Sequence, residues 1–213
     1  MNIKQRYQAV IEWFETSMPT AETELQYDST FHLLIAVILS AQCTDKRVNT
    51  ITPPLFEAFP TPASMAAATE EQIKEYIKSV SYPNNKARNL LGAARMITAE
   101  LGGEIPSDMD TLLRIPGVGR KTANVMLAVA FNKQAMPVDT HVFRVSERIG
   151  LTSGSRLPLE TERTLCRYSP REKLSRAHHW LILHGRYTCK ARRPDCLNCG
   201  LTSVCRYYNS SEK

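Results

Sequence analysis

The spacing of apolar residues is the feature that most narrows the folds open to this chain. Apolar side chains recur at intervals of three and four, the spacing of one face of an α-helix. No stretch of five or more residues alternates convincingly between apolar and polar, as a half-buried strand would. We therefore predict an all-α fold of many short helices. The predicted helices cover residues 3–16, 30–41, 45–59, 63–68, 70–80, 84–100, 108–114, 121–131, 141–149, 160–168 and 175–186.

Two segments carry more detailed expectations. Residues 30–41 are apolar nearly all round, which is typical of a buried helix. The segment 70–80 is amphipathic, and four residues share one face: Ile73, Tyr76, Ile77 and Val80. Four prolines are expected to punctuate the short helices around them: Pro53, Pro54, Pro60 and Pro62.

The charge of the chain is unevenly distributed. Its 213 residues carry a formal net charge of +6, and in residues 185–213 six basic side chains stand against two acidic ones. This balance indicates an anionic partner, although an ordinary basic enzyme would have the same composition. The N-terminal segment lacks the long apolar stretch of a signal peptide, and no run approaches the roughly 20 apolar residues of a membrane span. We expect a soluble intracellular protein.

Four cysteines near the C-terminal end form the pattern C-x6-C-x2-C-x5-C: Cys189, Cys196, Cys199 and Cys205. Such a group in an intracellular protein indicates a metal site rather than a disulfide framework. Zinc sites with four cysteines usually use two C-x2-C pairs, and only one pair here has that spacing. The wider gaps favour a [4Fe–4S] cluster, while a zinc site and a site without metal stay open.

The first gap between these cysteines contains three cations, Lys190, Arg192 and Arg193. A metal that ties the two ends of this loop would hold the cations on a small rigid projection. Such a projection suits contacts with DNA phosphates, which position a protein without reading sequence. A metal-stapled loop with merely solvated charges is the alternative.

Residues 115–125, IPGVGRKTANV, place a glycine turn directly before an apolar helix. The pattern resembles a helix-hairpin-helix, whose turn and helix start present backbone N–H groups to an anion. Lys121 lies in the first turn of that helix, where partial positive charge disfavours the ammonium form. A lysine there can act as an amine nucleophile, and a solvated or phosphate-bound lysine is the alternative.

Asp139 follows 18 residues later and precedes a predicted helix. Its position suits an N-cap, since aspartate accepts hydrogen bonds from the first turn of a helix. A carboxylate near a buried lysine could also orient it, take its proton or stabilise a cationic transition state. Lys121 and Asp139 together are a more specific signal than either residue alone.

Taken together, these stretches resemble the endonuclease III family of DNA base-excision-repair glycosylases. The resemblance rests on LLIAVILSAQCTD (33–45), IPGVGRKTANVMLAVAF (115–131), VDTHVFRV (138–145), HHWLILHGRYTCKARRPDCLNC (178–199) and Cys205. It implies two lobes. A six-helix barrel would comprise residues 23–134, with the helix-hairpin-helix at about 108–131. A helical lobe with the [4Fe–4S] loop at 189–205 would combine residues 1–22 and 135–213.

The resemblance also implies roles for individual residues. Lys121 would be the nucleophile and Asp139 its carboxylate partner. Gly117, Val118 and Gly119 would meet a DNA phosphate through their N–H groups. Gln42 would enter the gap left by an extruded base, and Asp45 and His141 would line the site. The four cysteines would hold one [4Fe–4S] cluster per chain, and Arg120 is expected to face DNA or solvent.

The activity that the resemblance implies is bifunctional. A DNA N-glycosylase would flip an oxidised pyrimidine such as thymine glycol out of duplex DNA and remove it. The Schiff base on Lys121 would then allow elimination of the 3′ phosphate, which is the reaction of an abasic-site lyase. We expect a monomer that acts on double-stranded DNA in the cytoplasm or nucleoid of a prokaryote, with no membrane partner.

Two positions depart from the family pattern. Where the family usually has Leu-Tyr before Asn-x-Lys-Ala, this chain has Tyr82 followed by Pro83. An aromatic wedge would then stack on bases in place of an aliphatic one. Cys43 replaces the common alanine after Gln42 and is small enough to pack in its place.

Two other functions compete with this one. An adenine mismatch glycosylase shares the hairpin and the cluster, but it usually lacks a lysine at the position of Lys121 and carries a long C-terminal recognition domain. A non-catalytic DNA-binding module would use the hairpin and cluster alone, and it leaves Lys121 and Asp139 unexplained.

Overall fold

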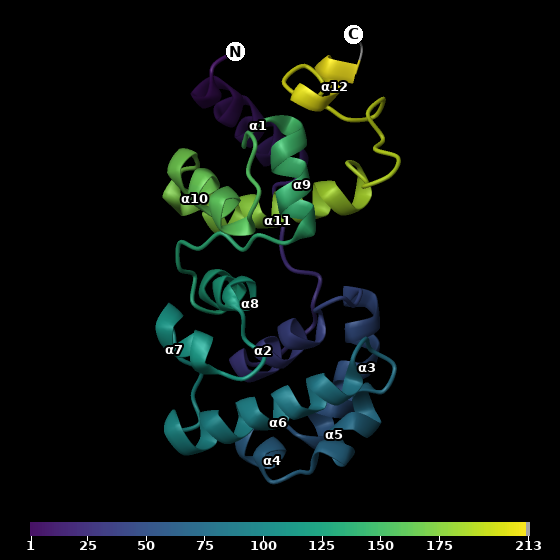
Figure 1. Cartoon of the computed structure of the whole chain (residues 1–213), viewed down its shortest axis with the longest axis vertical. Coiled ribbons are helices and arrows are strands. Elements are labelled where there is room, and N and C mark those ends of the chain that lie inside the picture. The colour runs from purple at the N-terminus through teal and green to yellow at the C-terminus, as the bar shows by residue number, and fades with distance from the viewer. Residues whose placement is uncertain (212–213) are drawn as a thin grey trace. The chain divides into compact units, whose positions relative to one another are not determined.

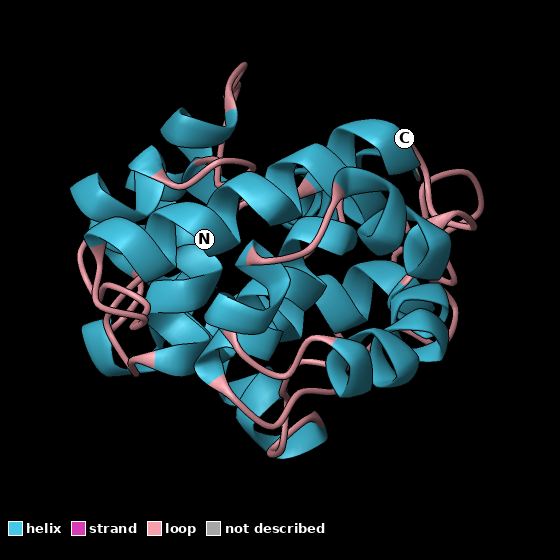
Figure 2. Ribbon diagram, turned by 90° about the horizontal axis from the view of Figure 1, so that it is seen from below, coloured by secondary structure: helices cyan, strands magenta, loops and turns pink. Residues whose placement is uncertain are grey.

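The computed structural model describes residues 1–211, apart from the side chain of Ser211. Within these residues the chain consists of helices and loops, without strands, which confirms the predicted all-α class (Figure 2). The α-helices are α1 (Ile3–Ser17), α2 (Thr30–Leu39), α3 (Asp45–Ala58), α4 (Pro62–Ala66), α5 (Glu70–Ile77), α6 (Pro83–Glu100), α7 (Met109–Arg114), α8 (Arg120–Val125), α9 (Thr140–Ile149), α10 (Pro158–Tyr168), α11 (Leu174–Tyr187) and α12 (Arg206–Ser211). A π-helix, η1 (Met126–Ala130), and a 3-10 turn, η2 (Arg171–Lys173), complete the set.

The predicted helices differ from the observed ones in a few places. α3 runs through Pro53 and Pro54, as the predicted range 45–59 did, although these prolines were expected to punctuate the helices in this region. Each proline removes a backbone donor, but α3 also buries Val48, Ile51 and Leu55, and this packing outweighs the local preference. Neither η2 nor α12 was predicted. Glu212 and Lys213, two of the charges counted in the C-terminal segment, lie outside the described residues.

The apolar face of the segment 70–80 is buried except at Tyr76. Ile73, Ile77 and Val80 are buried, but 38% of Tyr76 is exposed. Its ring packs edge-on against Phe59 at a centroid distance of 5.7 Å, at the surface rather than in the core. A tyrosine tolerates such a position because its hydroxyl is polar.

The chain forms two compact units. One contains 24–131, and the other combines 1–23 with 132–213. These units begin and end within a few residues of the two predicted lobes, while the assignment of a six-helix barrel to the first of them stays a prediction.

The unit 24–131 is built around α2, whose residues Phe31–Leu39 are all buried. α2 contacts α3, α6, α8 and η1, and α6 lies along α4 and α5 (Figure 1). The expectation of a fully buried helix at 30–41 therefore holds for its central residues. α6 is the longest helix and supports several of the loops that were singled out as DNA contacts.

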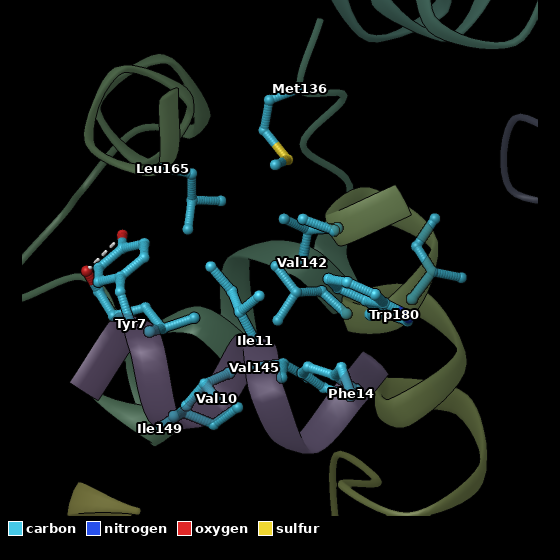
Figure 3. Packing of buried hydrophobic residues seen from close by; sticks show 14 of the residues in the cluster. Tyr7, Val10, Ile11, Phe14, Met136, Val142, Val145, Ile149, Leu165 and Trp180 are labelled. Carbon is cyan, nitrogen blue, oxygen red and sulfur yellow. Dashed lines mark hydrogen bonds between the residues drawn. The ribbon is translucent and has the colours of Figure 1, made fainter. Parts of the chain in front are cut away.

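The other unit has a core formed by α1, α9 and α11 (Figure 3). The rings of Phe14 and Trp180 stack with centroids 5.6 Å apart and planes inclined by 6°. The Tyr7 hydroxyl donates to the carbonyl oxygen of Leu151 over 2.9 Å, and the indole of Trp180 donates to the carbonyl of Met18 over 2.8 Å. These contacts join the N-terminal helix to the C-terminal half of the chain.

Candidate active site and cluster loop

The turn between α7 and α8 has the geometry of a hairpin. Gly117 has a φ of +82°, and a Cβ atom there would lie only 2.9 Å from Cβ of Asn89 on α6. Gly119 has a φ of −94° and open space where a Cβ would point. The packing of the protein therefore requires glycine at 117. At Gly119 the open space would let a bound group approach the backbone.

Val118, between the two glycines, is buried, and its N–H is bonded within the turn. Its N–H donates to the carbonyl oxygen of Ile115 over 3.0 Å, and only 7% of the residue is exposed. We expected this N–H to meet a phosphate, but in the turn it is already engaged. The side chain of Val118 instead anchors the turn in the core, so the proposed phosphate donors are narrowed to Gly117 and Gly119.

Lys121 is the second residue of α8, whose N-cap is Gly119. It is half-buried, whereas Arg120 before it is exposed, as expected. The helix after it buries Ala123, Asn124 and Val125 and continues as the π-helix η1. Lys121 is thus held on a short, firmly packed helix, close to the partial positive charge of the helix start.

Asp139 is the N-cap of α9. Its Oδ1 accepts from the backbone N–H groups of His141 and Val142, each over 2.8 Å. These two bonds satisfy donors that the first turn of a helix leaves unpaired. They also orient the carboxylate, so the capping role and a chemical role are compatible. Lys121 belongs to the unit 24–131 and Asp139 to the other unit.

His141 lies in the first turn of α9 and is half-buried against α11. A Cβ at Gly185 would lie 3.0 Å from Cβ of His141, so only glycine permits this approach of the two helices. The guanidinium of Arg144 lies 3.2 Å from Nδ1 of His141. Because arginine can only donate, Nδ1 of His141 is the acceptor in this contact.

Gln42 and Tyr82 occupy two exposed loops of the unit 24–131. Both have left-handed backbone conformations, with φ values of 54° and 56°. Such a conformation costs a non-glycine residue about 1–3 kcal/mol and is often found at functional sites. Tyr82 is the N-cap of α6 and is 63% exposed, while Asp45 begins α3 and is half-buried.

The four cysteines line one cavity together with His184, Leu201 and Tyr207 among others. The cavity encloses about 350 Å³, including space open to solvent. None of the six cysteines forms a disulfide, and all four in this loop are half-buried. Among the described residues, no three Cys, His, Asp or Glu side chains lie close enough to hold a single metal ion.

Comparison with known proteins shows the family to which this chain belongs. Residues 35–171 match the model of the HhH-GPD superfamily of base excision DNA repair proteins. Endonuclease III of Rickettsia felis is 46% identical over 94% of this chain and 94% of its own length. Endonuclease III of Bacillus subtilis is 44% identical over 100% of this chain and 97% of its own. The chain belongs to the endonuclease III family.

A solved structure agrees with this assignment. The structure of a trapped endonuclease III–DNA covalent intermediate, an estranged-adenine complex, matches with a TM-score of 0.95 and 43% identity. The match covers 100% of both chains. The all-α fold of this chain is therefore that of endonuclease III.

The cysteine loop fits the cluster that the resemblance to endonuclease III implies. A [4Fe–4S] cluster takes four cysteine thiolates, and four thiols line the cavity. Burial raises the pKa of the thiols of Cys196 and Cys199. Without a cation these thiols would therefore stay protonated, so a metal centre is what would stabilise their thiolates.

The cations of this endonuclease III loop are exposed, as expected of residues that contact a large partner. Lys190, Arg192 and Arg193 all lie at the surface. The neck of the loop is closed because the N–H groups of Lys190 and Asp195 both donate to the carbonyl oxygen of Thr188 over 2.9 Å. The cations are therefore displayed on a loop whose ends meet.

Two arginines that hold this loop, Arg144 and Arg148, were not predicted from the sequence. Arg144 donates to the carbonyl oxygens of Gly185 over 2.9 Å and Cys189 over 3.2 Å, and Arg148 donates to carbonyls in the loop itself. Burial lowers the pKa of Arg144, and the charge of Arg148 lowers it further. Both side chains lie one turn apart on α9, inside the family motif VDTHVFRV and just after it, so their spacing was the available signal.

Proposed function

We propose that this chain is a DNA N-glycosylase and abasic-site lyase that removes oxidised pyrimidines, such as thymine glycol, from duplex DNA. The observation that carries the proposal is the position of Lys121, half-buried at the start of α8 and directly after the glycine turn. It is supported by membership of the endonuclease III family and by the covalent DNA intermediate named for a 43% identical endonuclease III.

In this proposal the protein first binds the phosphate backbone. The N–H groups of Gly117 and Gly119 meet one phosphate, and Lys190, Arg192 and Arg193 meet others. Gln42 fills the gap left by the extruded base, while the ring of Tyr82 enters the stack as a wedge. An oxidised, ring-saturated pyrimidine stacks poorly, so its extrusion costs less than that of an intact base.

The chemistry then depends on an amine. Asp139 accepts a proton from Lys121, and the neutral Nζ attacks C1′ of the sugar. A C–N bond forms and the glycosidic bond breaks, so the base leaves with the electron pair and takes up a proton. Opening of the sugar ring yields a Schiff base. Loss of a proton from C2′ then breaks the bond between C3′ and its oxygen, which releases the 3′ phosphate.

We further propose that Cys189, Cys196, Cys199 and Cys205 hold one [4Fe–4S] cluster. When bound, the cluster would cross-link the loop and so keep its cations in place. A monomer suffices for these steps, and the substrate would place the protein with the DNA of a prokaryotic cell, in the cytoplasm or nucleoid.

Borohydride trapping on duplex DNA containing thymine glycol tests the central claim. The wild-type protein should form a covalent adduct, and Lys121→Gln should form none while keeping its fold. An adduct of equal yield with Lys121→Gln would refute the role of the lysine. Absence of both an adduct and base release with the wild type would favour a non-catalytic DNA-binding module. Release of adenine from mismatches, with thymine glycol untouched, would favour the adenine glycosylase.

The cofactor has a separate test. The purified protein should be brown, with about four irons and four sulfides per chain. A colourless protein with one tightly bound zinc ion would overturn the cluster assignment without touching the assignment of Lys121.

A further inference from the structure

Two loops of the unit 24–131 are held in conformations that need outside support. Among the described residues, three non-glycine residues have a positive φ, and Gln42 and Tyr82 are two of them. A left-handed backbone at such residues persists only where neighbouring groups hold it. Tyr82 also precedes Pro83, whose ring restricts the residue before it further.

A buried lysine connects the first loop to α6. Nζ of Lys86 donates to the carbonyl oxygens of Leu39 over 2.8 Å and Ala41 over 2.7 Å. Leu39 ends α2, so this ammonium satisfies carbonyls that the C-terminal end of a helix leaves unpaired. Lys86 is only 6% exposed, and its burial lowers its pKa. A lysine buried in this way holds its position because its ammonium needs these acceptors.

The second loop is tied directly to the first. The hydroxyl of Ser81 donates to the carbonyl oxygen of Gln42 over 2.7 Å. Ser81 immediately precedes Tyr82, and Lys86 lies in the first turn of the helix that Tyr82 caps. Three carbonyls of the segment 39–42 are thus bound by two side chains from the segment 81–86.

The same helix supports the hairpin. Lys86, Asn89 and Gly92 are spaced three apart on α6 and so lie along one face. Asn89 lies against Gly117, and a Cβ at Gly92 would be 3.2 Å from the ring of Pro116. One face of α6 therefore supports the loop of Gln42 and the glycine turn, while its N-terminal end carries Tyr82.

We propose that Lys86 is a positioning residue which, with Ser81, locks the segment 39–42 to the start of α6, so that Gln42 and Tyr82 meet DNA as one preformed unit. This inference rests on the proposed function. A preformed unit needs no ordering when the base is extruded. Lys86 should thus matter for extrusion and for the response to the opposite base, and less for elimination at a site that has already lost its base.

The test compares two reactions of each variant under single-turnover conditions with saturating protein. One is release of thymine glycol opposite each of the four bases, and the other is strand cleavage at a preformed abasic site. A fluorescent base analogue beside the lesion reports extrusion. Lys86→Met keeps the length of the side chain but removes its donors. Lys4→Met, at an exposed lysine of α1, is the matched control.

We expect Lys86→Met to slow extrusion and base release about tenfold and to flatten the dependence on the opposite base. Cleavage at the abasic site should fall by less than about threefold. Ser81→Ala removes the bond to Gln42 without emptying a buried site, so it should fold and show a smaller effect of the same kind. The double variant should lose less than the sum of the single losses, because both side chains act on one unit.

The outcomes separate this inference from the proposed function. If both reactions of Lys86→Met and Ser81→Ala match the wild type, the positioning role is wrong while the proposed function stands. An equal fall in both reactions, in proportion to a loss of folded protein seen by circular dichroism, would show a merely structural role. A wild-type protein that neither releases thymine glycol nor cleaves the abasic site would overturn the proposed function, and this inference with it.

Discussion

Arg148 on α9 donates to the carbonyl oxygen of Lys190 over 2.7 Å. Its other terminal nitrogen donates to the carbonyl of Ala191, also over 2.7 Å, and the guanidinium lies 3.6 Å from Sγ of Cys189. The planar fork of arginine matches two adjacent carbonyls, which a lysine could not do as well. Helix α9, which Asp139 caps, thereby holds the loop that contains the exposed cations and the cysteines.

Arg148→Met should loosen this loop. The variant loses two hydrogen bonds to the loop backbone and a positive charge beside Cys189. Partners behind a metal ligand typically affect metal retention about tenfold or more, so we expect the cluster to be lost about tenfold faster. Bleaching of the visible absorbance in the presence of an iron chelator measures the rate. Arg163→Met, at an exposed arginine of α10, is the control, and equal bleaching rates for the two variants would contradict the assignment.

Arg192→Gln and Arg193→Gln should weaken DNA binding without changing its sequence dependence. Each contact with a phosphate releases counterions, so each substitution should reduce the slope of log affinity against log salt by about 1. Fluorescence anisotropy with an undamaged duplex, measured from low to moderate salt, gives the slope. Lys4→Gln serves as the charge-matched control. An unchanged slope for both arginine variants would mean that these cations stay in solvent.

Asp139→Asn and Asp139→Ala should separate the capping role of this residue from its chemistry. Asparagine still offers an oxygen to the N–H groups of His141 and Val142, so its fold should keep nearly full stability. Alanine removes the cap and should cost about 1 kcal/mol of unfolding free energy. Both variants should lose trapping on thymine glycol DNA, because neither can take a proton from Lys121. Full activity of Asp139→Asn would reduce Asp139 to a helix cap.

Gly117→Ala should lower the stability of the protein, whereas Gly119→Ala should lower its affinity for DNA. At Gly117 an added Cβ meets Asn89 and the backbone is left-handed, so the variant should lose about 1–3 kcal/mol of stability. At Gly119 the free protein has room for a Cβ, so the melting temperature should hardly change. A phosphate that approaches this backbone would be pushed away, so DNA affinity should still fall. Unchanged affinity in Gly119→Ala would exclude close approach of a phosphate there.

His179 should make the protein less stable in mild acid. His179 is 8% exposed, and its burial lowers its pKa below 6.5. A hydrogen bond to the carbonyl oxygen of Ser175 and the charge of Glu22 raise the pKa, but burial is the larger effect. Because the unfolded chain then binds the proton more readily, stability is full above about pH 6.5 and is lost as the pH falls towards the lower folded value. His179→Gln should show a smaller drop in melting temperature between pH 7.5 and pH 5.5. A drop as large as in the wild type would contradict this origin.

Periodicity and local chemistry were sufficient for most of the fold. The burial of the segment that became α2 was visible in its almost wholly apolar sequence, and Asp139 could be recognised as a cap from its place before a helix. Residues 45–59 were predicted as one helix in spite of Pro53 and Pro54, and the burial of Ile51 and Leu55 explains why α3 continues through these prolines. Tyr76 illustrates a limit of this reasoning, since periodicity alone does not tell a half-exposed aromatic from a buried one.

The candidate site, too, could be predicted from the sequence only in part. The glycine turn, Lys121 and the four cysteines could be found from residue types and spacing, and with the family resemblance they indicated a repair enzyme. The engaged N–H of Val118 could not be anticipated, because it depends on how tightly the turn closes. The roles of Lys86 and Arg148 were also hidden, because their acceptors are backbone carbonyls, which every residue possesses and no motif marks.

The amino-acid sequence thus established the helical class, the kind of chemistry and the residues that can perform it, since these depend on periodicity and on the identity of side chains. Only the folded structure showed which loops are held in place and which side chains hold them. The loop of Gln42 is held by Ser81 and Lys86, whose bonds span 39 to 47 residues of the chain, and the cysteine loop is held by Arg148 from a separation of 42 residues. Such long-range contacts follow from the packing of distant segments, and a one-dimensional pattern does not encode them visibly.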